Sequence, residues 1–218
     1  MPGKLCVYCG ANECGTSDHV PPANLFPPPR PSTLITVPSC ETCNVGFSLD
    51  DEYFRIVICT RPDLSENSAV QRLIPITLKG LDRPESSPFK RAFLDATRTV
   101  GGTMQLQLNN HRLNRVAERT VRGLHYAKSA RSLPAANVNA FYELAFDPPD
   151  IQPIFPLQSI LAALREEPPT VIQPDVFEYR VTGISGKPDA SAWLLTFFAR
   201  AWFLVLVNWR SVENELRQ

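Results

Sequence analysis

The chain has 218 residues, of which 44% are hydrophobic and 20% are charged. Lysine and arginine together number 22, as do aspartate and glutamate, so the formal net charge at pH 7 is zero. This is the composition of an ordinary folded protein, and it excludes both a disordered chain and a strongly basic one. Any affinity for nucleic acid must therefore come from a local basic surface.

The N-terminal residues lack the apolar run of a secretion signal. The longest apolar run, residues 193–207, is shorter than a membrane-spanning helix and contains Arg200. The sequence therefore predicts a cytoplasmic protein that makes no contact with membranes. In that reducing compartment, cysteines at regular spacing favour metal binding over disulfides.

Four of the six cysteines form two Cys-x-x-Cys pairs, Cys6/Cys9 and Cys40/Cys43, in the first quarter of the chain. The two pairs can present four thiolates to one tetrahedral Zn²⁺, which would stabilise a segment too small to build its own core. The alternative, a redox-active pair, would need a thioredoxin-like βαβ pattern, which neither pair has around it. We therefore predict a structural zinc site.

Between the two pairs, a proline cluster in residues 21–31 excludes a helix interior or a central strand and predicts a stiff, exposed loop. Residues 34–37 then read as a short strand. After Cys43, Ser48 begins a capping-box pattern, so a helix is expected from there to about Cys59. The acids at 50–52 would form its first turn and face solvent, unless Asp51 supplements a metal site.

The remaining residues, from about 61 to 218, predict a second part of α+β class with antiparallel strands. Residues 61–88 read as an irregular connection, and residues 111–131 have the period of an amphipathic helix. A proline-punctuated stretch, residues 148–174, is expected to wrap the surface. The expected strands are residues 73–78, 103–108, 141–146, 176–181 and 193–207, the last bent near residues 199–201 into a hairpin.

The helix expected at 111–131 carries four arginines on the face opposite its apolar residues: Arg112, Arg115, Arg119 and Arg122. Such a stripe can contact the phosphates of nucleic acid and supply affinity that does not depend on sequence. It can equally be a solvated helix face with no ligand. The sequence leaves both interpretations open.

Two further motifs flank the cysteine pairs: Asp18-His19-Val20-Pro21 follows the first, and Asn44 comes directly after the second. Together with the pairs, they resemble the HNH endonuclease superfamily over about residues 6–59. The resemblance implies a ββα-metal fold, in which a β-hairpin and a helix surround one metal ion. The fold class expected is therefore α+β, with a zinc-stapled module at 1–60 and an α+β domain at 61–218 that selects the substrate or a partner.

The resemblance also implies the roles of individual residues. His19 would be the general base that activates water, and Asp18 and Asn44 would hold a catalytic Mg²⁺ or Mn²⁺. The family's middle Asn, which orients the catalytic His, falls by spacing on Thr33 or Ser32, with Asn24 as an alternative. These residue types suit phosphodiester hydrolysis, because imidazole is a base near neutral pH and hard divalent ions prefer oxygen ligands.

The activity implied is a metal-dependent endonuclease that cuts nucleic acid, with double-stranded DNA as the usual target, and leaves a 5′-phosphate and a 3′-hydroxyl. One alternative is a zinc-dependent module that binds nucleic acid or protein without catalysis, since Thr33 stands where the family has Asn. Another is that the C-terminal part binds a protein partner or a second copy of the chain and thereby regulates the zinc module.

Overall fold

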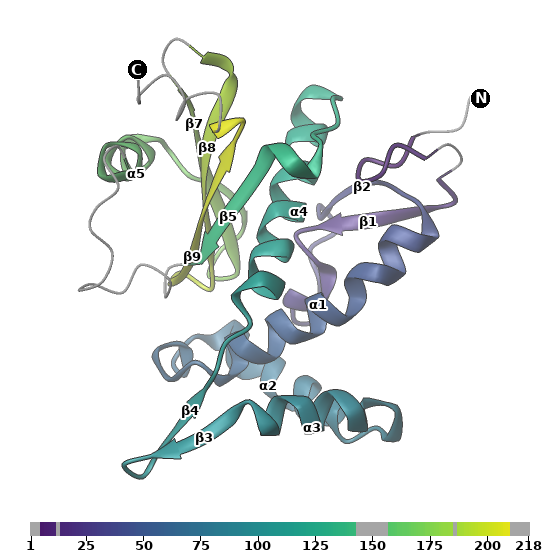
Figure 1. Ribbon diagram of the computed structural model, residues 1–218, viewed down its shortest axis with the longest axis vertical. Helices are drawn as coiled ribbons and strands as arrows, with labels where there is room; N and C mark the ends of the chain where they lie inside the picture. Colours follow the sequence, from purple (N-terminus) through teal and green to yellow (C-terminus); the bar gives the residue numbers. More distant parts are fainter. Residues whose placement is uncertain (1–4, 12–13, 143–156, 185–186, 210–218) are drawn as a thin grey trace.

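The computed structural model describes residues 5–11, 14–142, 157–184 and 187–209 and has a mixed α+β architecture (Figure 1). Every strand pairing in these residues is antiparallel. The α-helices are α1 (Glu41–Thr60), α2 (Ser68–Leu81), α3 (Ser87–Asp95), α4 (Asn110–Ser129) and α5 (Leu157–Glu166). The strands are β1 (Thr16–Val20), β2 (Ile35–Ser39), β3 (Thr97–Val100), β4 (Thr103–Leu106), β5 (Val138–Tyr142), β6 (Thr170–Gln173), β7 (Phe177–Ile184), β8 (Lys187–Phe197) and β9 (Ala201–Val207).

The N-terminal segment folds into a hairpin followed directly by a helix. β1 pairs with β2 over their full lengths, and only Cys40 separates β2 from α1. The expected helix start at Ser48 is wrong, because Cys40 is the N-cap and its sulfur accepts from the backbone N–H of Cys43. Ser48 instead lies inside α1, where its hydroxyl donates to the carbonyl of Val45. The strand expected at 34–37 corresponds to β2.

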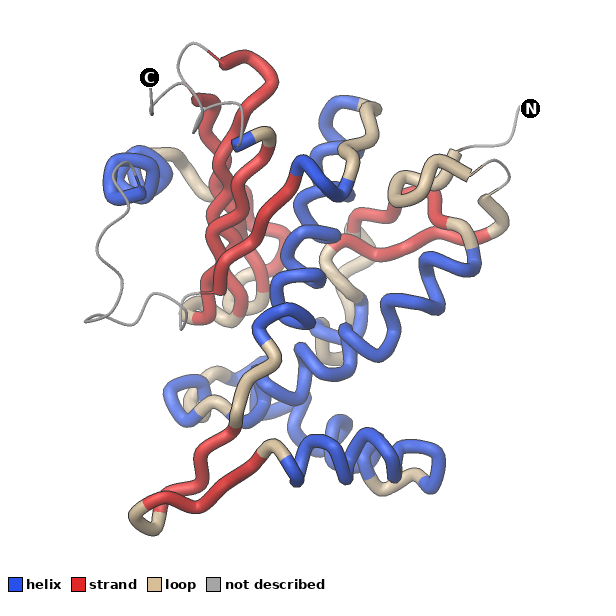
Figure 2. Tube along the Cα trace, viewed as in Figure 1, coloured by secondary structure: helices blue, strands red, loops and turns tan. Residues whose placement is uncertain are grey.

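The larger sheet has the strand order β5-β9-β8-β7-β6. Helix α4 contacts β5 and β9, and α5 contacts β7 and β8, so that the sheet lies between these two helices (Figure 2). Successive side chains of a strand point to opposite faces of the sheet, so each face packs against a different helix. Trp193 and Leu195 belong to the main core, whereas Ala192 and Leu204 lie on the opposite face and pack against Leu164 of α5.

The hairpin expected at 193–207 is confirmed as β8 and β9, although no glycine marks its turn. Phe198 and Ala199 adopt positive φ values of 53° and 62° there. This conformation is unfavourable for residues with a side chain, so it persists only where surrounding contacts fix it. Phe198 is buried, its N–H donates to the carbonyl of Val176, and its carbonyl accepts from the side chain of Asn67.

Two expectations for the middle of the chain are wrong. Residues 61–88 contain α2 and the start of α3, and the stretch expected to be a strand, 73–78, lies inside α2. Pro75 suggested a break, but the side chain of Asn67 caps this helix and an apolar face that includes Val70 and Leu73 is buried.

The stretch at 148–174 was expected only to wrap the surface, but it contains α5 and β6. Its first part, and residues 143–146 of the strand expected at 141–146, lie outside the described residues. None of the helices within the described ranges is long and apolar enough to cross a membrane.

The N-terminal unit and the large sheet share one hydrophobic core. Phe54 of α1 is fully buried, and its ring lies 4.9 Å from that of Phe197 and 5.4 Å from that of Phe203, measured between centroids. Helix α4 runs between the hairpin and the sheet (Figure 1) and contacts both. Gly123 permits its close approach to β1, because a Cβ at this position would overlap Val20. The core is therefore continuous across residue 60.

Candidate functional site

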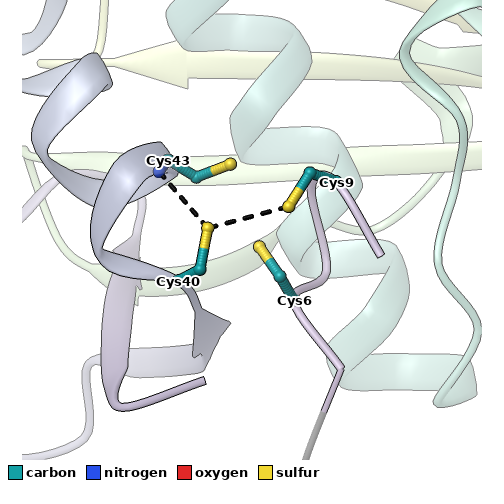
Figure 3. Close-up of side chains that lie close together, drawn as sticks. All are labelled: Cys6, Cys9, Cys40 and Cys43. Carbon is teal, nitrogen blue, oxygen red and sulfur yellow. Dashed lines mark hydrogen bonds between the residues drawn. The ribbon is translucent and has the colours of Figure 1, made fainter. Parts of the chain in front are cut away.

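The two Cys-x-x-Cys pairs converge in space. The Sγ atoms of Cys6, Cys9, Cys40 and Cys43 all lie within 4.8 Å of one another, and those of Cys9 and Cys40 are 3.6 Å apart (Figure 3). Tetrahedral Zn²⁺ with Zn–S bonds of about 2.3 Å places its sulfur ligands roughly 3.8 Å apart. The cluster can therefore hold a metal ion such as zinc, as the cysteine spacing predicted.

Each pair is presented by a different local structure. In the first, the N–H of Gly10 donates to the carbonyl of Cys6, closing a tight turn in which Gly10 has a φ of +73° that favours glycine. The N–H of Val7 donates to the carbonyl of Pro38 and thereby joins this turn to β2. The second pair lies in the first turn of α1, so the cluster ties the N-terminal turn to the helix.

The thiols of the cluster differ in acidity. Burial acts to raise the pKa of Cys6, but backbone hydrogen bonds from Cys40, Cys9 and Tyr8 outweigh it and lower the pKa to about 6. For Cys43, burial and hydrogen bonding to the Cys40 and Cys9 thiols raise the pKa well above its usual range. Because zinc binds thiolates, binding must displace protons, and metal affinity is expected to rise with pH.

Asp18 lies on β1 and its side chain is buried. Its Oδ2 accepts a hydrogen bond of 2.7 Å from the hydroxyl of Tyr8 and lies 3.5 Å from Nε of Arg119. Burial, followed by the negative charge of Asp18, raises the pKa of Tyr8, so the phenol stays protonated and remains a donor.

Arg119 comes from α4 and is only 4% exposed. Its Nη2 donates to Oδ1 of Asp51 at 2.6 Å, and its guanidinium stacks over the ring of Phe47 at 4.5 Å. Burial disfavours the charged form of Arg119, but Asp51 and Asp18 outweigh it and raise its pKa. Two carboxylates, the buried Asp18 and the partly buried Asp51, thus share this one guanidinium.

The arginine stripe expected on α4 is not a solvent-facing surface. Arg112 and Arg115 both pair with Asp50 of α1, at 2.8 and 3.1 Å. Arg122 is buried and donates to the backbone carbonyls of Leu133 and Tyr8. Together with Arg119, these residues connect α4 to the hairpin-helix unit. Arg115, with 44% of its side chain exposed, is the most accessible of the four.

The acids at 50–52 were expected in a solvent-facing first turn of the helix, and this expectation is wrong. They lie in the middle of α1, where Asp50 is buried and Asp51 is partly buried against Arg119. The arginines on α4 therefore pair with the acids on α1. Helical spacing gives the same signal for a solvated charged face and for a face that pairs with another helix.

We expect Asp51 to make stability depend on pH. Burial, opposed by Arg119, raises its pKa from 3.8 to about 6. The folded protein therefore holds a proton that the unfolded chain loses, so the free energy of unfolding should fall by on the order of 2 kcal/mol as pH rises from 4 to 6. Urea denaturation of the zinc-loaded protein in that range, with no Mg²⁺ or Mn²⁺ added, should show this slope in the wild type and lose it in Asp51→Asn. Equal slopes would contradict the assignment, since both proteins carry the same cysteines.

His19 follows Asp18 on β1 and points to the opposite face of the strand. Its backbone pairs with Thr36, so these two side chains are neighbours on one face. The half-buried ring has no hydrogen-bond partner within the described residues, so its nitrogens are available to water or substrate. Thr33, the residue expected to orient His19, is exposed in the turn before β2 and forms no hydrogen bond to it.

Asn44 lies in the first turn of α1 and faces β1. Its Nδ2 lies 3.4 Å from both Oγ1 of Thr16 and the carbonyl of Ser17 and donates to each. This contact holds the start of the helix against the strand that carries Asp18 and His19. Asn24, the other residue considered for orienting His19, lies in a short 3-10 helix (Ala23–Leu25), and its buried Oδ1 has no hydrogen-bond partner among the residues that the structure describes.

The comparisons with known proteins found no matching family model, no matching curated protein and no matching solved structure.

Proposed function

We propose that this chain is a zinc-stapled, metal-dependent endonuclease of the HNH type that hydrolyses phosphodiester bonds of nucleic acid, with DNA as its first expected substrate. The observation that carries the proposal is the contact of Asn44 with β1. It brings the residue after the second cysteine pair to the strand that bears Asp18 and His19. Three groups that this chemistry needs thus come from adjacent parts of one hairpin-helix unit.

In this proposal His19 removes a proton from the water that attacks phosphorus. An imidazole can act as a base at neutral pH, and the ring of His19 has no protein hydrogen bond in the described part of the chain that would have to be broken first. Thr36 lies across the strand pair on the same face and is better placed than Thr33 to orient the ring. We therefore assign the orienting role to Thr36.

Asp18 and Asn44 would hold Mg²⁺ or Mn²⁺ through their side-chain oxygens. When bound, the ion supplies a positive charge that stabilises the charge developing on the phosphate. The charges in the site fit such an ion, because among the described residues Arg119 is the one cation paired with Asp18 and Asp51, and the three groups carry one excess negative charge. A buried charge without a partner is costly, so a cation beside Asp18 would be stabilising.

The experiment uses the full chain, loaded with zinc, and fluorescently labelled oligonucleotides. Double- and single-stranded DNA and RNA are incubated with Mg²⁺, with Mn²⁺ or with EDTA, and the ends of any products are tested for ligation. We expect cleavage of DNA that requires the divalent ion and leaves a ligatable 5′-phosphate. Cleavage of RNA alone would change the substrate but keep the reaction, whereas cleavage that persists in EDTA would contradict the proposed role of the ion.

A second candidate function is a zinc-dependent module that binds nucleic acid without cutting it. The observation that favours it is that Oδ2 of Asp18 already accepts from Tyr8 and faces Arg119, which leaves less of the carboxylate for an ion. Retarded migration of the same oligonucleotides on a gel, with no cleavage under any metal condition, would establish this second function instead.

A further inference from the structure

The surroundings of Asp18 include charged groups that the resemblance to nucleases did not predict. Arg119 comes from α4 and lies 3.5 Å from the buried carboxylate of Asp18, and Asp51 comes from α1 and pairs with the same guanidinium. Arg119 is held by its hydrogen bond to Asp51 and by its stacking on Phe47, so its charge is fixed in place. The electrostatic environment of Asp18 is therefore set by side chains from outside the hairpin.

We propose that Arg119 and Asp51 set the charge of the cation site at Asp18, with Arg119 as a positioning residue, so that the site is electrically balanced only when ion and phosphodiester are both bound. This inference rests on the proposed function. The two carboxylates and the guanidinium together carry one negative charge. A divalent ion reverses it to one positive charge, which the single negative charge of a phosphodiester then cancels.

Removing Arg119 and removing Asp51 should each change the affinity of the site for the divalent ion. Arg119 repels a divalent ion at Asp18 because its positive charge lies beside that carboxylate, and Asp51 attracts the ion because its negative charge is paired with the same guanidinium. A unit charge within about 6 Å of a divalent ion changes its binding by at least about tenfold, even at the dielectric constant of water. The effects of removing Arg119 and Asp51 should therefore have opposite signs and should cancel when both are removed.

The experiment measures Mn²⁺ binding to the zinc-loaded full chain by electron paramagnetic resonance, with no nucleic acid present. Asp18→Asn identifies binding at the proposed site, because it should remove one bound Mn²⁺ per chain. The charge variants are Arg119→Gln, Asp51→Asn and the double variant, and Arg119→Lys preserves the charge. Arg115→Gln is the matched control, because it also pairs with α1 but contacts Asp50 rather than Asp18.

We expect Arg119→Gln to bind Mn²⁺ at least about tenfold more tightly than the wild type and Asp51→Asn to bind it about tenfold more weakly. The double variant, Arg119→Lys and Arg115→Gln should stay within about threefold of the wild type. The double variant also keeps the test valid if Arg119→Gln fails to fold, because it removes the Asp51 carboxylate together with Arg119, and Asp18 keeps its hydrogen bond from Tyr8. In that case Asp51→Asn and the double variant still differ.

Two outcomes would overturn the proposal, and they are distinguishable. If Asp18→Asn removes a bound Mn²⁺ but Asp51→Asn and Arg119→Gln bind the ion like the wild type, Arg119 and Asp51 serve only to pack the helices, and the proposed function stands without this inference. If the wild type binds no Mn²⁺ that depends on Asp18, the ion site of the proposed function is wrong as well.

Discussion

Replacing Cys40 with serine is expected to abolish metal binding and to unfold the hairpin-helix unit. Cys40 has two roles, since its sulfur lies in the four-cysteine cluster and also caps α1 through the N–H of Cys43. Zinc contributes about 10–16 kcal/mol to the folding of small four-ligand modules, which is as large as the whole stability of a typical domain. We expect zinc content to fall from about one ion per chain to none, with loss of the cooperative thermal transition seen by circular dichroism.

Cys59→Ser provides the matched control for this prediction. Cys59 lies near the end of α1, outside the cluster, and its sulfur is 3.6 Å from the hydroxyl of Thr77. This variant should keep its zinc and lose no more than about 1 kcal/mol of stability. If Cys40→Ser retained zinc and melted like Cys59→Ser, the cluster would not be the element that stabilises the N-terminal unit.

Phe54→Ala is expected to have the second largest effect on stability. The ring of Phe54 is fully buried between α1 and the sheet, where it packs on Phe197 and Phe203. Truncating a buried phenylalanine costs about 3–5 kcal/mol, because the transfer free energy is lost and a cavity remains. The loss should destabilise the N-terminal unit and the sheet together, since they share this core.

Urea denaturation, followed both by circular dichroism and by tryptophan fluorescence, tests this prediction. The three tryptophans, Trp193, Trp202 and Trp209, lie in or directly after β8 and β9, so their fluorescence reports on the sheet. The helical signal reports largely on α1, α2 and α4. Both signals should shift to lower urea by the same amount, as in a two-state transition. Leu49→Ala is the control on the same helix, because Leu49 is 60% exposed and should cost less than about 0.5 kcal/mol. Two separate transitions in Phe54→Ala would contradict a shared core.

The cysteine cluster could be predicted from the sequence because chelation fixes its spacing locally. Each Cys-x-x-Cys pair brings two sulfurs together within one turn, and four of them are what one zinc ion needs. The hairpin of β8 and β9 was also predictable, since residues 193–207 form an almost continuous run of apolar and aromatic residues. The long helix α4 was predictable because its apolar residues recur with a period of about 3.6. These signals depend on neighbouring residues and require no knowledge of the rest of the fold.

The pairing of α4 with the hairpin-helix unit could not be predicted in the same way. Arg119 and Asp51 are 68 residues apart, and nothing in the local sequence of either residue indicates the other. A charged helical face is also the usual sign of a solvated surface. Helix α2 was not predicted from the sequence for a related reason. Pro75 and Gly80 disfavour a helix locally, and only burial of the apolar face against the rest of the fold outweighs that cost.

The measurement that tests the central claim most directly is the rate at which the zinc-loaded full chain cuts supercoiled plasmid DNA at saturating Mn²⁺. His19→Ala is compared with the wild type, and His111→Ala, which removes an exposed imidazole from α4, is the control. We predict that the rate falls at least about 100-fold in His19→Ala and is unchanged in His111→Ala, because general-base catalysis typically contributes 10²–10⁴-fold. A folded wild type that never cuts, or a His19→Ala protein that cuts at the wild-type rate, would contradict the claim that His19 is the base of a nuclease.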